Sequence, residues 1–158
     1  MRREHATRAL RLSLALVLLG GSTATRVVSA DDVARVRKDG ARQLVDDYIR
    51  LYRRETLERW KDLFLPTFTA TYTNDDGSVS TRTLDDFYER QRSGFAAGEM
   101  TETLSNLSIQ EKGRLASAAA DFDFTSRGAA RRGKLMLLMI EDRGQLKIAA
   151  LIFTYHSE

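Results

Sequence analysis

The spacing of apolar residues along the chain predicts helices first and strands afterwards. Between about residues 32 and 54 apolar side chains recur every three or four positions, which is typical of an amphipathic helix. A second, shorter helix is predicted between Thr56, which can cap it, and Pro66, which marks its end. A third helix is predicted to begin after Thr83, because Thr83 followed by Asp86 resembles a capping box.

From residue 67 the period changes to two, which indicates strands. Residues 67–74 alternate Thr with Phe68, Ala70, Tyr72 and Asn74, and the turn at 75–77 leads to a short return strand at 78–81. After the third helix come four more alternating segments separated by turn residues, and together they predict an antiparallel meander. These segments are residues 101–110, 115–126, 134–141 and 146–156.

Two segments of the meander are apolar at every position. Residues 135–140 read Leu-Met-Leu-Leu-Met-Ile and residues 148–153 read Ile-Ala-Ala-Leu-Ile-Phe, so both faces of the sheet need cover there. Helices can cover one face. A second copy of the chain is the economical cover for the other face, so a homodimer is predicted.

The first thirty residues have the order of features that is typical of an export signal. Arginines at the start precede an apolar run at 12–19 and the small residues Val28-Ser29-Ala30. The run is about half the ~20 residues needed to cross a membrane, so no stable membrane insertion is expected after cleavage. We therefore predict a signal peptide at 1–30 and a single exported domain at 31–158, periplasmic or extracellular.

Composition then removes several classes of function. The formal charge of +3 becomes −1 once residues 1–30, with five Arg and one Glu, are removed, so no nucleic-acid partner is expected. The remaining basic cluster of Arg127, Arg131, Arg132 and Lys134 is interpreted as a solvated hairpin loop. With no Cys, and His156 the sole histidine after residue 30, no metal site and no cofactor are predicted.

The order of these elements and their spaced aromatics resemble one known superfamily. Tyr48 on the first helix, residues 60–66 running into a strand, Asp76-Gly77 and Phe87 on a helix are followed by the meander. Over residues 41–156 this resembles the nuclear transport factor 2-like superfamily, which includes SnoaL-like and ketosteroid-isomerase-like proteins. The resemblance implies an α+β fold, a cone-shaped curved antiparallel sheet with three N-terminal helices on its concave face, and dimers through the convex face.

The resemblance gives one match to the catalytic residues of the ketosteroid isomerases. Tyr48 stands where the family has its oxyanion tyrosine, whereas Tyr72 and Met136 stand near the positions of its two aspartates. Since neither replacement can do the work of a carboxylate, isomerase activity of that type is not expected. Asp121 and Asp123 share the strand face opposite the neighbouring phenylalanines, so they are interpreted as rim or solvent-facing carboxylates.

Three functions remain open, and the first is favoured. The domain binds a small apolar or aromatic molecule in its cone, or it is a dimeric accessory module with a filled cone, or it is an enzyme that uses Tyr48 or a carboxylate assigned to the wrong face. For the first, strand parity predicts an apolar pocket without an ionised carboxylate. Its predicted lining is Tyr48, Tyr72, Phe68, Ala120, Phe122, Phe124, Met136, Leu138, Leu151 and Phe153.

Overall fold

The computed structural model describes residues 30–156, which form helices packed against one sheet. The order of elements predicted from the sequence is confirmed. Along the chain lie α1 (Ala30–Leu51), the short 3-10 helix η1 (Arg54–Thr56), α2 (Leu57–Lys61), β1 (Phe64–Thr73), β2 (Val79–Thr83), α3 (Leu84–Ala97), β3 (Met100–Lys112), β4 (Leu115–Ser126), β5 (Ala129–Asp142) and β6 (Gln145–Tyr155). The predicted export signal lies outside the described residues except for Ala30. No helix within 30–156 is both long and apolar enough to cross a membrane.

The sheet has six strands in the order β2-β1-β6-β5-β4-β3. Neighbouring strands are antiparallel except β1 and β6, which are parallel, with Ala70 opposite Leu151. The α+β class and the curved sheet are confirmed, but the expectation of a wholly antiparallel sheet is wrong at this pair. The alternation of side chains along a strand shows which residues share a face. It does not show whether a strand that is distant in sequence pairs with it in a parallel or an antiparallel direction.

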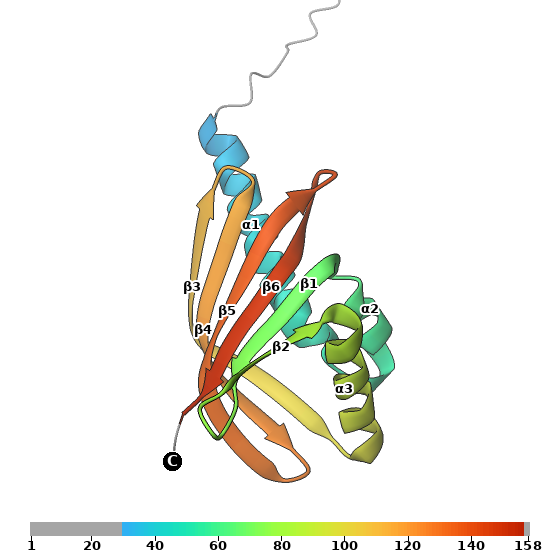
Figure 1. Ribbon diagram of the computed structural model, residues 1–158. Coiled ribbons are helices and arrows are strands. Elements are labelled where there is room, and N and C mark those ends of the chain that lie inside the picture. Colours follow the sequence, from blue (N-terminus) through green and yellow to red (C-terminus); the bar gives the residue numbers. More distant parts are fainter. Residues whose placement is uncertain (1–29, 157–158) are drawn as a thin grey trace, which may run out of the picture.

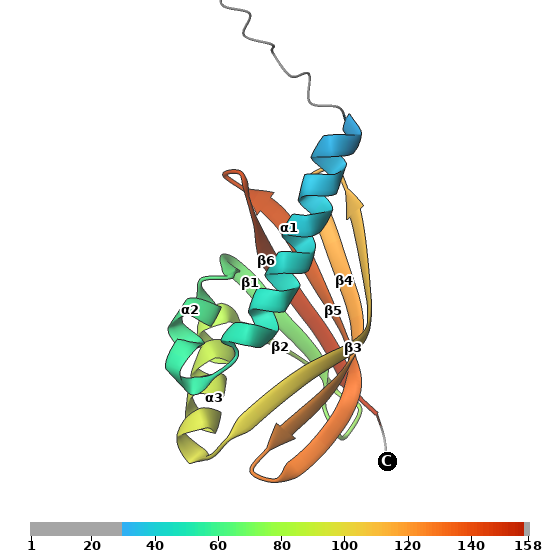
Figure 2. The same cartoon turned by 180° about the vertical axis from the view of Figure 1, so that it is seen from behind.

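All the described helices lie on one face of the sheet (Figure 1). Helix α1 packs against β3, β4 and β6, and α3 packs against β1. Seen from behind, β3 bends across toward α3, so the sheet curls around the helix side at that end (Figure 2). The concave face and the helices thus enclose a cone, and no helix of the described chain covers the convex face.

Irregular positions in the strands accompany this curvature. The pairing of β3 with β4 shifts between Ser105 and Ser108, where Asn106 has a positive φ of 52°. A second shift, in β6 opposite Leu138 and Met139, follows Ile148. Such bulges bend a strand and reverse which side chains face inward beyond them.

Gly133, on β5, lies tightly against β6 and the ring of Phe122. A Cβ at this position would lie 2.1 Å from the carbonyl oxygen of Thr154 and 2.6 Å from the ring of Phe122. Only a residue without a side chain fits between β6 and that ring. The glycine therefore lets β5 pass over Phe122 inside the cone.

Residues Met136 and Leu138 face outward, which corrects the prediction that they line the interior. They are 42% and 37% exposed, whereas Leu135 and Leu137 are 5% and 0% exposed. When both faces of a strand are apolar, its sequence does not determine which face is buried. Here the register with β4 decides it, because Leu135 pairs with Ala120 on the concave face.

An aromatic cluster around Trp60 joins the helices to the sheet. The Trp60 ring centroid lies 4.6 Å from that of Phe64, 5.2 Å from Tyr52, 5.6 Å from Tyr48 and 5.8 Å from Phe87. Trp60 is fully buried. Aromatic groups at these separations bury much apolar area and hold one another in tilted arrangements. The cluster therefore holds α1 in position against α2, α3 and β1.

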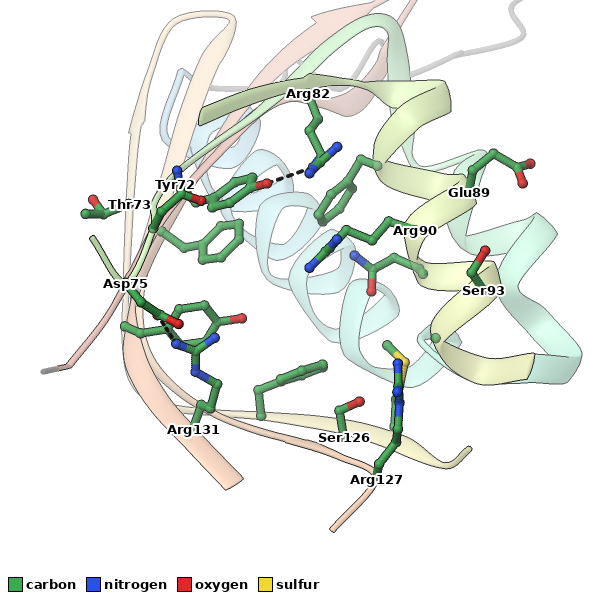
Figure 3. A pocket seen from close by; sticks show the side chains of 18 residues that line it. Tyr72, Thr73, Asp75, Arg82, Glu89, Arg90, Ser93, Ser126, Arg127 and Arg131 are labelled. Atoms are coloured by element: carbon green, nitrogen blue, oxygen red, sulfur yellow. Dashed lines mark hydrogen bonds and ion pairs between the residues drawn. The ribbon is translucent and has the colours of Figure 1, made fainter. Parts of the chain in front are cut away.

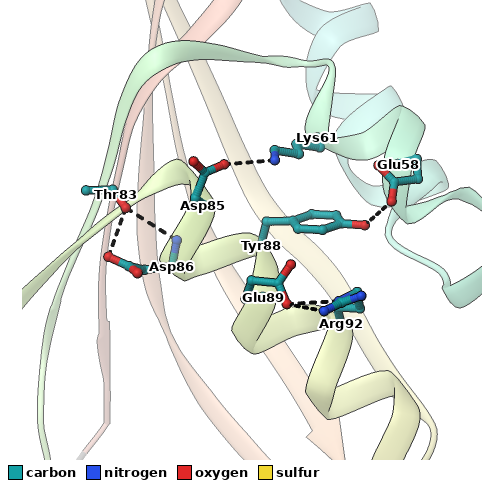
Figure 4. A network of polar contacts seen from close by, with 8 residues as sticks. All are labelled: Glu58, Lys61, Thr83, Asp85, Asp86, Tyr88, Glu89 and Arg92. Carbon is teal, nitrogen blue, oxygen red and sulfur yellow. Dashed lines mark hydrogen bonds and ion pairs between the residues drawn. The ribbon is translucent and has the colours of Figure 1, made fainter.

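Polar contacts fix α3 against α2 (Figure 4). Lys61 Nζ donates to Asp85 Oδ1 at 2.8 Å, and the Tyr88 hydroxyl donates to Glu58. The predicted cap of α3 is confirmed, because Thr83 Oγ1 accepts a hydrogen bond from the Asp86 backbone N–H at 3.3 Å. These contacts orient α3 so that its opposite side faces the cone.

The predicted cap at Thr56 is wrong. Its hydroxyl donates to the carbonyl oxygen of Leu51 at 2.8 Å and caps no N–H of α2. Thr56 therefore satisfies the C-terminal end of α1. The strand after α2 also begins earlier than predicted, at Phe64, with Pro66 inside β1.

Candidate functional site

The cone contains two adjoining hollows. The larger one, which we call the vestibule, has a volume of about 810 Å³ and lies between α3, the β1–β2 turn and the β4–β5 hairpin. The smaller one, the inner cavity, has a volume of about 50 Å³ and lies beneath α1. Both are lined by Phe87, Gln91, Phe124, Phe153 and Tyr155. The vestibule thus has the volume of a ligand site, whereas the packed side chains leave little space beneath α1.

A tyrosine and a glutamate face each other in the inner cavity. Tyr48, from α1, is 2% exposed, and its hydroxyl lies 3.4 and 3.5 Å from the two carboxylate oxygens of Glu102. Glu102 is on β3, where it pairs with Phe124 of β4. Glu102 also lines the inner cavity. The rest of the lining is mostly aromatic and aliphatic, with Gln91 as a further polar side chain.

The low polarity of this cavity alters the acidity of both groups. Burial raises the pKa of Glu102 to about 7, although the hydrogen bond from Tyr48 opposes the shift. Burial, followed by the nearby charge of Glu102, raises the pKa of Tyr48 well above its usual value. At neutral pH Glu102 is therefore present in both protonation states, while Tyr48 remains a hydrogen-bond donor.

Glu102 corrects the expectation that the pocket has no ionised carboxylate, because it lines the inner cavity and is partly ionised at neutral pH. The signal that could have found it is the alternation of Glu102 with Leu104, which places both on one face of β3. The bulge at Asn106 hides this signal, because the inward side chains continue at Leu107 and Ile109, which are of opposite parity.

Four arginines surround the vestibule (Figure 3). Arg82 comes from β2, Arg90 from α3, Arg127 from the β4–β5 turn and Arg131 from β5. Arg82 Nε donates to the Tyr72 hydroxyl at 2.7 Å.

Arg131 pairs with Asp75, and its guanidinium lies 3.9 Å from the centroid of the Tyr155 ring. Its neighbour Arg132 pairs with Asp123 at 2.8 Å, and Lys134 pairs with Asp121 at 2.6 Å. The basic cluster predicted to be a solvated loop is thus divided. Arg127 alone lies in the turn, and the other three residues belong to β5. Arg127 and Arg131 line the vestibule. A two-residue turn at Arg127-Gly128, with both φ angles positive, makes this possible.

The structure brings most of the predicted pocket residues into the cone, but not all of them to its hollows. Tyr72 lines the vestibule, and its ring stacks on Phe153 at 5.1 Å. Phe68 and Ala120 are buried in the core and line neither hollow. The predicted residues that line the inner cavity are Tyr48, Phe122, Phe124, Leu151 and Phe153. In the described part of the chain, no three metal-ligating side chains cluster.

These features define a class of protein: a small α+β domain whose curved sheet and helices enclose a cavity of ligand size. No protein-family model matches the sequence, and no curated protein matches it. The solved structures, however, show that the chain has the nuclear transport factor 2-like fold. The resemblance inferred from element order is confirmed at the level of the fold.

Three of these solved structures illustrate the likeness. A nuclear transport factor 2-like protein of unknown function from Shewanella baltica is 11% identical, with 78% of this chain and 97% of that chain covered and a TM-score of 0.59. A putative scytalone dehydratase from Novosphingobium aromaticivorans is 15% identical (80% and 89% covered, TM-score 0.65). The beta subunit of a putative aromatic-ring-hydroxylating dioxygenase from the same organism is 16% identical (80% and 93%, TM-score 0.61). Identity this low shows a shared fold alone.

Proposed function

We propose that this protein binds a small, flat, largely aromatic molecule in its cone. The observation that carries the proposal is a set of aromatic side chains, Phe87, Phe124 and Phe153, that line both the vestibule and the inner cavity with its Tyr48–Glu102 pair. The volume of the vestibule lies in the range of small-molecule sites. The rings offer stacking surfaces, and the Tyr48–Glu102 pair offers a hydrogen-bond donor and an acceptor for one polar group of the ligand.

The proposal is tested with N-phenyl-1-naphthylamine, an uncharged flat probe whose fluorescence rises in an apolar site. The wild type should bind one equivalent, and Phe124→Leu should weaken binding about threefold to tenfold, because a stacking surface is lost. Phe95→Leu is the matched control, since Phe95 is buried but lines neither hollow. No binding to the wild type, or an equal loss in both folded variants, would contradict the proposal.

A second candidate function is proton transfer on a bound molecule, and Glu102 is the observation that favours it. A carboxylate with a pKa near 7 can accept a proton from a carbon acid and return it. Once Glu102 is protonated, the Tyr48 hydroxyl is released from its hydrogen bond to that carboxylate and can donate to the developing oxyanion. The structural neighbours carry no weight in this choice, because their likeness extends to the fold only.

The second function is tested by exchange of acidic C–H protons of a cyclic enone in D₂O, followed by NMR. If Glu102 is the base, the wild type should accelerate deuteration and Glu102→Gln should abolish the acceleration. Tyr48→Phe should reduce the rate about 10²-fold without abolishing it, as is typical when one oxyanion donor is lost. Acceleration that persists in Glu102→Gln would exclude this role for Glu102. If the wild type binds the enone without accelerating exchange, proton transfer is excluded and only ligand binding remains.

A further inference from the structure

The vestibule carries more positive charge than a pocket for a purely apolar molecule requires. Its lining contains four arginines but only two carboxylates, Asp75 and Glu89. Both carboxylates already have partners, because Asp75 pairs with Arg131 and Glu89 pairs with Arg92 at 2.5 Å. Figure 3 also shows the Glu89 side chain directed away from the hollow. The positive charge of the remaining arginines is therefore not balanced within the vestibule.

Three guanidinium groups face the vestibule without a carboxylate. Among the described residues, neither Arg90 nor Arg127 forms an ion pair. Arg82 donates to the uncharged hydroxyl of Tyr72. In Figure 3 these side chains reach the hollow from different sides, with the Ser126 hydroxyl between Arg127 and Arg131. Guanidinium groups arranged around a hollow are suited to bind a carboxylate, sulfonate or phosphate oxygen.

The arginines lie on the vestibule side of the aromatic residues that the two hollows share. Phe124 and Phe153 line both hollows, and Phe124 is three residues before Arg127. The Tyr48–Glu102 pair lies on the inner-cavity side of these rings, and the arginines lie on their vestibule side. The inner cavity disfavours an anion, because the negative charge of Glu102 would repel it. An anionic substituent is therefore directed outward, into the vestibule.

We propose that the ligand is an aromatic acid, held with its rings in the cone and its anionic group among Arg82, Arg90 and Arg127. This inference rests on the proposed function, since the rings must contact the aromatic residues that line the cone. It adds the chemical class of the ligand and its direction of binding. Because the arginines are accessible to solvent, added salt weakens the binding of the acid and leaves that of an uncharged analogue unchanged.

A matched pair of probes tests separately whether the cone binds aromatic rings and whether the vestibule binds an anionic group. 8-Anilinonaphthalene-1-sulfonate is N-phenyl-1-naphthylamine with one added sulfonate, so the ratio of their affinities measures recognition of the anion. The wild-type chain should prefer the sulfonate by at least about tenfold at low salt, because hydrogen bonds to charged groups are the strong ones. The double variant Arg90→Gln/Arg127→Gln should lose most of this preference and keep its affinity for the uncharged probe.

The control double variant is Arg42→Gln/Arg59→Gln. It removes the same charge from exposed positions on α1 and α2 that do not line the vestibule, so it should keep the wild-type preference. Failure of the uncharged probe to bind the wild type would contradict the proposed function. Binding of that probe with no preference for the sulfonate, or a preference that Arg90→Gln/Arg127→Gln retains, would overturn the inference about acids alone.

Discussion

Replacing Glu102 by glutamine tests the electrostatics of the inner cavity directly. In the folded protein burial raises the pKa of Glu102 from 4.5 to about 7. Because the folded value is the higher one, the native state holds more protons than the unfolded state between these pH values, and stability falls as pH rises through this window. One pKa unit corresponds to about 1.4 kcal/mol, so the ionised carboxylate destabilises the fold by about 3 kcal/mol above pH 7.

Glu102→Gln keeps the shape and the acceptor for Tyr48 but cannot ionise. We expect it to match the wild type within about 1 kcal/mol at pH 4.5 and to exceed it by about 2–3 kcal/mol at pH 8. Urea unfolding followed by the fluorescence of Trp60, the only tryptophan, measures both values. Other groups titrate equally in both proteins and cancel in the difference.

Glu99→Gln removes the same charge from an exposed position three residues earlier and is the control. Its stability relative to the wild type should not change between the two pH values. A difference between Glu102→Gln and the wild type that is constant with pH, or that shrinks as pH rises, would refute the reasoning. It would mean that the carboxylate is solvated in the cavity as well as it is in water.

Four further predictions concern other parts of the molecule. Tyr48→Phe removes the hydrogen bond that lowers the pKa of Glu102, so NMR titration of the Glu102 carboxyl should show a higher midpoint than in the wild type. An unchanged midpoint would exclude this hydrogen bond. Gly133→Ala should destabilise the fold by about 2 kcal/mol or more in urea unfolding, because its Cβ meets a backbone carbonyl at 2.1 Å; a neutral effect would contradict the close packing there. We propose that the chain dimerises through the convex face, where Met136 is 42% exposed. Light scattering at tens of micromolar should then find a dimer for the wild type and a monomer for Met136→Glu. A wild-type monomer would refute the proposal. We also propose export with cleavage after Ala30, which intact-mass analysis of exported protein checks and retention of Met1 would disprove.

The sequence by itself determined the kind and order of the elements, because these depend on local properties. The change of hydrophobic period near residue 67, the cap at Thr83 and the turn signals all act between residues close in the chain. The position of Tyr48 at the interior of the cone was also predictable, since a helix with one apolar stripe buries that stripe.

Only the tertiary structure decided which sheet face is buried in β5 and β6, and which strand lies beside β1. Met136 and Leu138 alternate along β5 with Leu135 and Leu137, and all four side chains are apolar. No local pattern therefore separates the outward pair from the inward pair. Their faces follow from the register with β4, and the faces in β6 change again at a bulge. Register and bulges are properties of pairs of strands, so a single strand does not encode them.

The candidate site depends on tertiary structure to an even greater degree. Glu102 meets Tyr48 across 54 positions of sequence, and its raised pKa arises from the protein atoms that surround it. Arg82, Arg90 and Arg127 come from a strand, a helix and a turn, and each read alone is an ordinary exposed cation. Their joint effect exists because the curved sheet brings three separate segments to one opening, and the energy of a charge depends on what lies around it in space rather than along the chain.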